Sequence, residues 1–290
     1  MGKASKTLGF RGRSPAGAAL RLLITVAAAW FGLVTPLIAD GGDAAFAYAA
    51  RLNGASLTQL TFAPFRRPEV GWEIYAPLIA HEIGSGSDAT TPAFAARLAA
   101  WQSARGLKPT GVMGVDTFDA LRNAWEARRP FVAASKRACP ASPPETSLAV
   151  IPPANAYVGK VMLLRPAALA AYRRMLEAAR SEVPALKSDP KLMTIFSAYR
   201  SIASDAARCA HEGNCQGVVR ATCSAHLTGL AIDIDLGAAP GYPPDSSEDV
   251  NRLYVSRGAA YRWMVANAPR FGFEPYPFEP WHWEWTGETI

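Results

Sequence analysis

Histidine is scarce in this chain, which contains only four in 290 residues. Two of the four, His226 and His282, lie in short C-terminal segments that also contain the carboxylates Asp233 and Glu279. Imidazole and carboxylate groups are usual ligands of a catalytic zinc ion, which keeps one coordination position for water. The concentration of the few histidines beside acids therefore indicates a zinc site suited to hydrolysis.

Acidic residues are absent before residue 40, where five basic residues occur. Removing these five from the formal net charge of +6 leaves +1 for the remainder of the chain. Binding to nucleic acid needs a clustered basic surface. The charge distribution therefore argues against a nucleic-acid partner, and with it against a metal nuclease.

The five basic residues precede an apolar run, residues 22–39. A basic segment before an apolar core is the layout of a secretory signal, and 18 residues are also just enough to span a membrane. We therefore expect residues 1–40 to be a signal peptide, with a retained membrane anchor as the alternative. Either one predicts export to the periplasm or cell envelope.

Only four cysteines are present, and no two form a CxxC pair. An oxidising compartment favours disulfides between Cys139, Cys209, Cys215 and Cys223. Three connectivities are open, and the sequence does not decide among them; we expect Cys209–Cys215 with Cys139–Cys223. The alternative, a second metal site, rests only on His211 between two of the cysteines and lacks zinc-ribbon spacing.

The pattern along the chain predicts two domains. Residues 41–68 are Ala-rich and weakly patterned, which indicates a tether, and the Pro-rich residues 128–155 indicate an interdomain linker. Between them, residues 69–127 predict a small three-helix domain whose first helix covers 71–83. Apolar residues at helical spacing there are Phe94, Leu98, Trp101, Phe118, Leu121 and Trp125.

The second predicted domain covers residues 156–290. Pro166 is well placed in the first turn of a helix, residues 192–196 read as a buried strand, and residues 261–268 read as a helix. Helices and strands are mixed without strict alternation, so an α+β fold fits better than a doubly wound sheet.

Residues 230–236 alternate with a period of two, which places Asp233 and Asp235 on the face opposite the apolar residues. His226 lies seven residues before Asp233, so a straight strand would send the two side chains to opposite faces. The Thr228-Gly229 pair supplies the bend that brings the imidazole round to the carboxylate. On spacing alone, Asp235 remains a rival ligand.

The C-terminal segment also alternates, with Trp281, Trp283 and Trp285 on one face, expected in the core. His282 and Glu284 share the other face. Pro280 makes a helix unlikely here and bends the chain, so that Glu279 can approach the open side of a metal. On spacing alone, Glu284 competes with Glu279 for the role of general base.

These two segments resemble the LAS metallopeptidases, which include zinc D-Ala-D-Ala carboxypeptidases of the VanY type. The family signature, SxHxxGxAxD followed by ExxH, is complete from Ser224 to Asp233 and from Glu279 to His282. The resemblance implies a small antiparallel sheet flanked by helices. It also implies that Zn²⁺ is bound by His226, Asp233 and His282, with Glu279 as the base.

The same resemblance implies the residues that contact substrate. The Tyr199-Arg200-Ser201 segment is similar to the family's arginine segment, so Arg200 would hold a substrate carboxylate or the oxyanion. Tyr199 and Ser224 are implied to lie at the substrate. Insertions after Ser201 and over 237–249 depart from the family pattern and are expected to rim the cleft, where they affect the choice of substrate.

Residues 69–127 resemble the peptidoglycan-binding domains that accompany cell-wall hydrolases. Both resemblances together imply an exported zinc peptidase that trims peptidoglycan stem peptides, most simply a D,D-carboxypeptidase; no protein partner is inferred. The alternatives are a peptidoglycan endopeptidase and a wall-binding protein with a structural zinc site. The matching segments are Leu98-Ala99-Ala100-Trp101-Gln102, Gly106-Leu107, Thr110-Gly111-Val112-Met113-Gly114 and Thr117-Phe118-Asp119-Ala120-Leu121.

Overall fold

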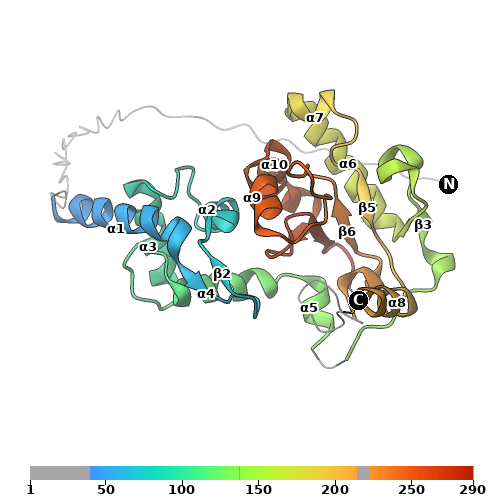
Figure 1. The fold of residues 1–290 in the computed structure, drawn as a ribbon, viewed down its shortest axis with the longest axis horizontal. Coiled ribbons are helices and arrows are strands. Elements are labelled where there is room, and N and C mark those ends of the chain that lie inside the picture. The colour runs from blue at the N-terminus through green and yellow to red at the C-terminus, as the bar shows by residue number, and fades with distance from the viewer. Residues whose placement is uncertain (1–39, 137, 214–222, 290) are drawn as a thin grey trace, which may run out of the picture. The chain divides into compact units, whose positions relative to one another are not determined.

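The structure is a computed structural model that describes residues 40–136, 138–213 and 223–289 (Figure 1). The predicted signal peptide or anchor, apart from its last residue, lies outside the described residues. Among the described residues, no helix is long and apolar enough to cross a membrane.

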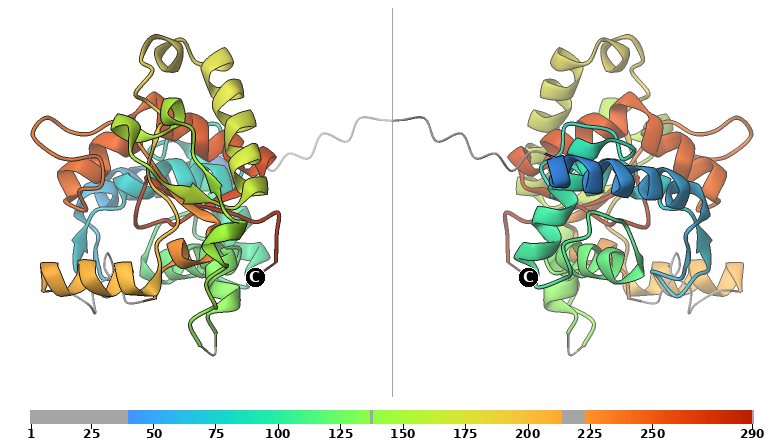
Figure 2. Two further views of the ribbon diagram at one scale, coloured as in Figure 1. Left: turned by 90° about the vertical axis from the view of Figure 1, so that its right-hand side faces the viewer. Right: turned by 90° about the vertical axis from the view of Figure 1, so that its left-hand side faces the viewer.

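Four helices of seven or more residues form most of the segment from residue 40 to residue 126, one helix more than predicted. The additional helix α1 packs along α3, and Figure 2 shows α1 in blue beside the helices that follow it. The predicted tether over 41–68 is therefore wrong. The elements of this part are α1 (Asp40–Gln59), β1 (Thr61–Phe62), β2 (Glu69–Val70), η1 (Glu73–Tyr75), α2 (Ala76–Glu82), α3 (Pro92–Ala104) and α4 (Val115–Glu126).

Asn53 explains why α1 is held in place. Its side chain is fully buried, donates to the carbonyl of Gly111 at 2.9 Å and accepts from the amide of Met113 at 2.8 Å. A buried carboxamide satisfied in this way specifies one packing arrangement, because losing either partner would leave a polar group unpaired. The apolar faces predicted for α3 and α4 are buried as expected.

Residues 128–155, predicted as a linker, differ from that expectation because several of them are built into the fold. Arg129 is buried, α5 (Pro130–Ala134) lies against strand β8, and Cys139 forms a disulfide with Cys223. Residues Ala39–Ile290 belong to one compact unit. The further elements up to residue 164 are η2 (Glu145–Ser147), β3 (Ala149–Val150), η3 (Pro153–Asn155), η4 (Tyr157–Gly159) and β4 (Leu163–Leu164).

The cysteines follow the expected pairing as far as the structure describes them. The Cys139–Cys223 disulfide is formed, and Cys209 is also disulfide-bonded. Its expected partner, Cys215, lies outside the described residues.

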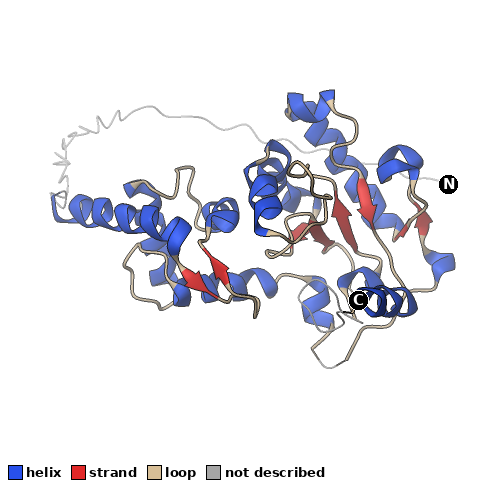
Figure 3. Cartoon of the chain, viewed as in Figure 1, coloured by secondary structure: helices blue, strands red, loops and turns tan. Residues whose placement is uncertain are grey.

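A four-stranded antiparallel sheet organises the C-terminal part, in the order β5-β6-β8-β7 (Figure 3). The chain is thus an α+β protein in which helices flank small antiparallel sheets, as predicted. The strands are β5 (Ile195–Ser197), β6 (Ala231–Ile234), β7 (Phe273–Pro275) and β8 (His282–Trp285). The helical elements are α6 (Pro166–Glu182), α7 (Pro184–Ser188), α8 (Ile202–Glu212), η5 (Ala225–Thr228), α9 (Asp249–Arg257), α10 (Ala259–Asn267) and η6 (Ala268–Phe271).

The strands β6 and β8 are buried along their whole length. Tyr172 of α6 donates to the carbonyl of Met193 at 2.7 Å, and the ring of Tyr261 in α10 lies edge-on to Trp283 of β8. Helices thus cover the sheet, and the three tryptophans predicted to lie in the core are buried.

Arg252 of α9 joins the helical part to the sheet. Its guanidinium is fully buried, donates to the hydroxyl of Tyr75 at 2.5 Å and lies 3.4 Å from a carboxylate oxygen of Glu69. It also donates to the carbonyl of Phe278 at 2.9 Å. A buried cation is tolerated only when it is paired and hydrogen-bonded, so these contacts fix the two parts against each other.

We predict that Arg252→Met lowers the free energy of unfolding by about 3–5 kcal/mol, because it leaves the carboxylate of Glu69 buried without its cation. Urea denaturation measures this change. The matched control is Arg257→Met, whose exposed ion pair with Glu73 should contribute less than about 1 kcal/mol. Equal losses of unfolding free energy in the two variants would contradict the role of Arg252 as a buried partner of Glu69.

Candidate active site

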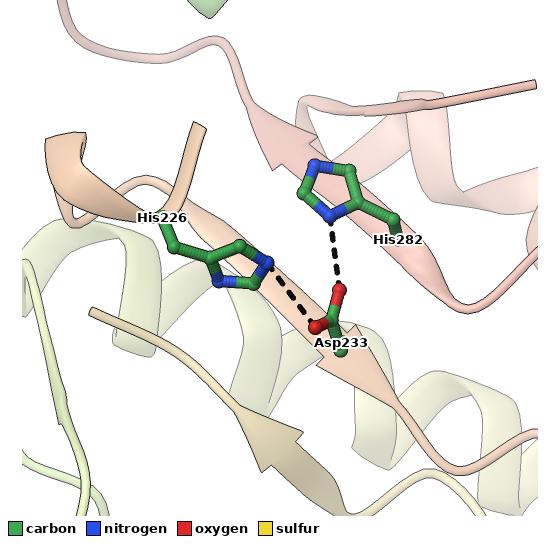
Figure 4. Close-up of side chains that lie close together, drawn as sticks. All are labelled: His226, Asp233 and His282. Carbon is green, nitrogen blue, oxygen red and sulfur yellow. Dashed lines mark hydrogen bonds and ion pairs between the residues drawn. The ribbon is translucent and has the colours of Figure 1, made fainter. Parts of the chain in front are cut away.

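Asp233 and His282 are brought together by strand pairing. They are direct partners in the antiparallel register of β6 and β8, a position at which side chains on the same face lie next to each other. Asp233 Oδ1 lies 2.9 Å from His282 Nδ1. Figure 4 shows this contact, with His226 reaching the other oxygen of the same carboxylate.

His226 lies in the short helical turn η5, which ends at Thr228 and is capped by Gly229. Gly229 has a φ of 69°, in the left-handed region that glycine adopts without strain, so the chain reverses into β6 as the sequence predicted. The ring nitrogen Nδ1 lies 2.8 Å from the carbonyl oxygen of Ala198 and therefore carries the hydrogen as donor. Nε2 is then the nitrogen available to a metal ion, and it lies 3.1 Å from Asp233 Oδ2.

His282 presents its nitrogens the other way round. Nδ1 faces Asp233, while the buried Nε2 lies 3.5 Å from Glu284 Oε1. Each imidazole thus directs one nitrogen to Asp233 and the other toward a protein oxygen, although only His226 makes a hydrogen bond there. Metal-binding histidines typically direct their second nitrogen to such an oxygen.

The three side chains fit a zinc ion by their chemistry and their spacing. Ligand atoms of His226, Asp233 and His282 all lie within 4.8 Å of one another, and all three residues are buried. Two imidazoles with one carboxylate are a usual ligand set of catalytic zinc. This is the only group of potential metal ligands that the described residues form. Asp235, the rival ligand, does not belong to it; its carboxylate accepts from the amide of Gly237.

The electrostatics of the cluster reflect its burial. Burial and the nearby Arg200 guanidinium lower the pKa of His226 to about 4. For His282, burial disfavours the charged ring, but Asp233 and Glu284 outweigh it and raise the pKa to about 9. Burial alone would raise the pKa of Asp233, yet the two imidazoles hold it well below its usual value. Asp233 is therefore an anion held in place by two rings.

Glu279 lies beside this cluster and forms no ion pair with an arginine or lysine among the described residues. One of its oxygens, Oε2, is 3.9 Å from His282 Nδ1, the nitrogen that faces Asp233. Burial raises the pKa of Glu279 to about 7, despite the opposing effect of His282. A carboxylate with that pKa is suited to exchange protons near neutral pH.

Glu284, the competitor for the base role, occupies a different environment. It lies on the far nitrogen of His282 and pairs with Arg129 at 2.6 Å. Burial would raise the pKa of Glu284, but the Arg129 guanidinium and His282 outweigh it and bring the pKa to about 2. A carboxylate held this firmly as an anion is poorly suited to accept a proton.

Arg200 and Ser224 are held together by Asp205, a residue the sequence analysis missed. Arg200 Nε donates to one oxygen of Asp205 at 2.6 Å, and the hydroxyl of Ser224 donates to the other. Arg200 Nη1 also lies 3.8 Å from Asp233 Oδ2. Asp205 sits one turn after Ser201, the N-cap of α8, and that capped acidic turn was its only signal in the sequence.

A cavity of about 330 Å³ opens over these groups, lined by Arg200, Ser224 and Glu279 among others. Tyr199 does not line it; its backbone amide donates to the carbonyl of Leu163. The predicted substrate contact of Tyr199 therefore finds no support here. The predicted insertions do reach the cavity, through Cys223 and Asp245.

The family model of VanY, described as D-alanyl-D-alanine carboxypeptidase, matches residues 161–288. That range contains the His226, Asp233 and His282 cluster together with Glu279 and Arg200. Residues 161–288 are a VanY-family domain. No curated protein and no solved structure matches the chain. The match supports a peptidase of a carboxypeptidase family whose members are zinc enzymes.

This match does not include residues 69–127, so their resemblance to peptidoglycan-binding domains stays a prediction.

We predict that the VanY domain binds one zinc ion per chain and that His226→Ala and Asp233→Ala remove it. Loss of a direct ligand should weaken binding beyond the roughly 10–100-fold that follows loss of a residue behind a ligand. Metal analysis after dialysis measures the occupancy. Asp235→Asn is the control, and it should keep full occupancy. Zinc loss in that variant, or its retention in the other two, would exclude the ligand set.

Proposed function

We propose that this protein is a zinc D,D-carboxypeptidase that removes the terminal D-Ala from peptidoglycan stem peptides. The observation that carries the proposal is the VanY-type signature folded into one cluster, with His226, Asp233 and His282 converging and Glu279 beside them. Intact Glu279 argues against a purely structural metal site, which needs no base. We further propose export to the cell envelope, on the strength of the basic and apolar N-terminal segment.

His226, Asp233 and His282 would hold the zinc ion, which would supply a water of lowered pKa and polarise the scissile carbonyl. Glu279 takes the proton from the attacking water on its carboxylate and then donates it to the leaving amine nitrogen, so that the proton count balances. Burial of the cluster keeps bulk water away and strengthens each charge interaction.

Arg200 supplies the positive charge for the substrate. Asp205 and Ser197 fix its guanidinium from two sides, which keeps the fork in one orientation. A planar guanidinium suits a carboxylate, and a carboxypeptidase substrate ends in a free carboxylate next to the scissile bond. We therefore assign Arg200 to that terminal carboxylate, with Ser224 as a hydrogen-bonding neighbour.

We predict that Glu279→Gln lowers kcat by about 10²–10⁴, because the amide cannot accept the proton of the attacking water. The measurement is the release of D-Ala from a pentapeptide that ends in D-Ala-D-Ala. Zinc content is measured on the same sample and should remain at one ion per chain. A Glu279→Gln variant with unchanged turnover would remove Glu279 from the base role.

We predict that Arg200→Met raises KM for the free-acid pentapeptide by about tenfold or more, since a charge-assisted bond to a carboxylate contributes about 1.5–3 kcal/mol. The same peptide with an amidated C-terminus lacks that charge. Wild-type protein should cleave it poorly, and the substitution should then change little. If wild-type protein cleaves both peptides equally well, or cuts only within the stem, the activity is that of an endopeptidase.

A further inference from the structure

The ring of His282 lies between two carboxylates, Asp233 at Nδ1 and Glu284 at Nε2. Nε2 of this ring is buried and makes no hydrogen bond to the described residues, and Glu284 Oε1 faces it at 3.5 Å. Glu284 itself is 1 % exposed. A buried carboxylate facing the outer nitrogen of a ligand histidine fixes the ring and increases its basicity as a ligand.

Glu284 is held in turn by residues outside the VanY match. Arg129 binds its Oε1 through Nε at 2.7 Å and Nη2 at 2.6 Å, and the backbone amide of Phe131 donates to Oε2 at 3.0 Å. Both carboxylate oxygens are thus fixed. Arg129 and Phe131 belong to the segment predicted to be a linker, some 30 residues before the matched range begins.

Arg129 is itself tightly placed. Its Nη1 binds Glu126 at the end of α4 at 2.7 Å, and the guanidinium carbon lies 4.1 Å from the centre of the Tyr276 ring. The ring of Tyr276 lies edge-on to His282. The guanidinium therefore has one orientation. It is fixed by α4 on one side and by the loop before β8 on the other.

We propose that Arg129 is a positioning residue of the metal site, acting through Glu284 on His282. The segment 126–131 then holds Glu284 behind His282, a contact that residues 161–288 cannot provide by themselves. This proposal rests on the zinc site of the proposed function, but not on the substrate or on the reaction. Without Arg129, the carboxylate of Glu284 loses both guanidinium contacts and is no longer held facing Nε2 of the ring.

Zinc affinity is the direct test. Substituting the residue behind a ligand histidine lowers metal affinity by about 10–100-fold, and we expect losses of that size for both Arg129→Met and Glu284→Gln. Because the two act on one ring in series, the double variant should lose little more than either single one. The dissociation constant is measured by competition with a chromophoric chelator on the full chain.

The neighbouring arginine provides the control. Arg128 is half exposed and pairs with Glu82 and Glu274, away from the histidine cluster. Arg128→Met should therefore leave zinc affinity within about twofold of wild type, well below the loss expected behind a ligand. Thermal unfolding of the zinc-free variants shows whether each is folded. If Arg129→Met does not fold, the nearly isosteric Glu284→Gln decides the matter.

The outcomes separate this proposal from the proposed function. Zinc affinities of Arg129→Met and Glu284→Gln that match that of Arg128→Met would overturn the positioning role, whatever the activity. Weakened affinities in a protein that binds zinc but cleaves no stem peptide would support the positioning role and remove the carboxypeptidase assignment. Absence of zinc binding in the wild-type protein would overturn both.

Discussion

The register between β6 and β8 is the constraint on which the site depends. It places Asp233 opposite His282 and leaves the tryptophans of β8 on the other face of the strand. A slip of β8 by one residue would turn every side chain of that strand to the other face, which would remove His282 from Asp233 and put tryptophan side chains in its place. Since β6 and β8 are buried throughout, such a slip is costly, and the same packing that stabilises the sheet holds two of the three ligands together.

The support for this register comes from far along the chain. Arg252 joins the sheet's loop at Phe278 to Tyr75, and Arg129 connects α4 to Glu284 in β8. Both guanidiniums are buried, so each connection is rigid only while every partner is present. The N-terminal helices therefore pack behind the site and help to hold its residues in place. A peptidase whose helical part were a freely tethered module would have no such contacts.

The chemistry of the site could be predicted from the sequence because the residues that carry it lie in two short segments. Alternation over 230–236 and 278–285, the bend at Gly229 and the signature residues identified the ligand cluster before any fold was known. The roles of Asp205 and Arg129 could not be found this way. Ser224 lies 19 residues from Asp205 and Glu284 lies 155 residues from Arg129, and only tertiary packing brings each pair close. The helix α1 was missed because its Ala-rich sequence has no clear apolar face, and its packing on α3 decides its structure. Tyr199 was assigned by its neighbour Arg200, but adjacent residues of an extended segment point in different directions.

Three carboxylates surround one imidazole in this site, and their surroundings give them different tasks. Asp233 lies between two rings and is kept as an anion, which suits a ligand. Glu284 is paired with Arg129 and has its pKa brought to about 2, which suits a fixed hydrogen-bond acceptor. Glu279 is equally buried and forms no ion pair with an arginine or lysine in the described part of the chain. Burial therefore outweighs the effect of His282, and the resulting pKa of about 7 lets Glu279 both take and return a proton. An arginine placed beside Glu279 would lower the pKa of that carboxyl group, and removal of Arg129 would raise the pKa of Glu284. The different pKa values of the three carboxylates, and hence their roles, thus follow from their charged neighbours and not from residue type.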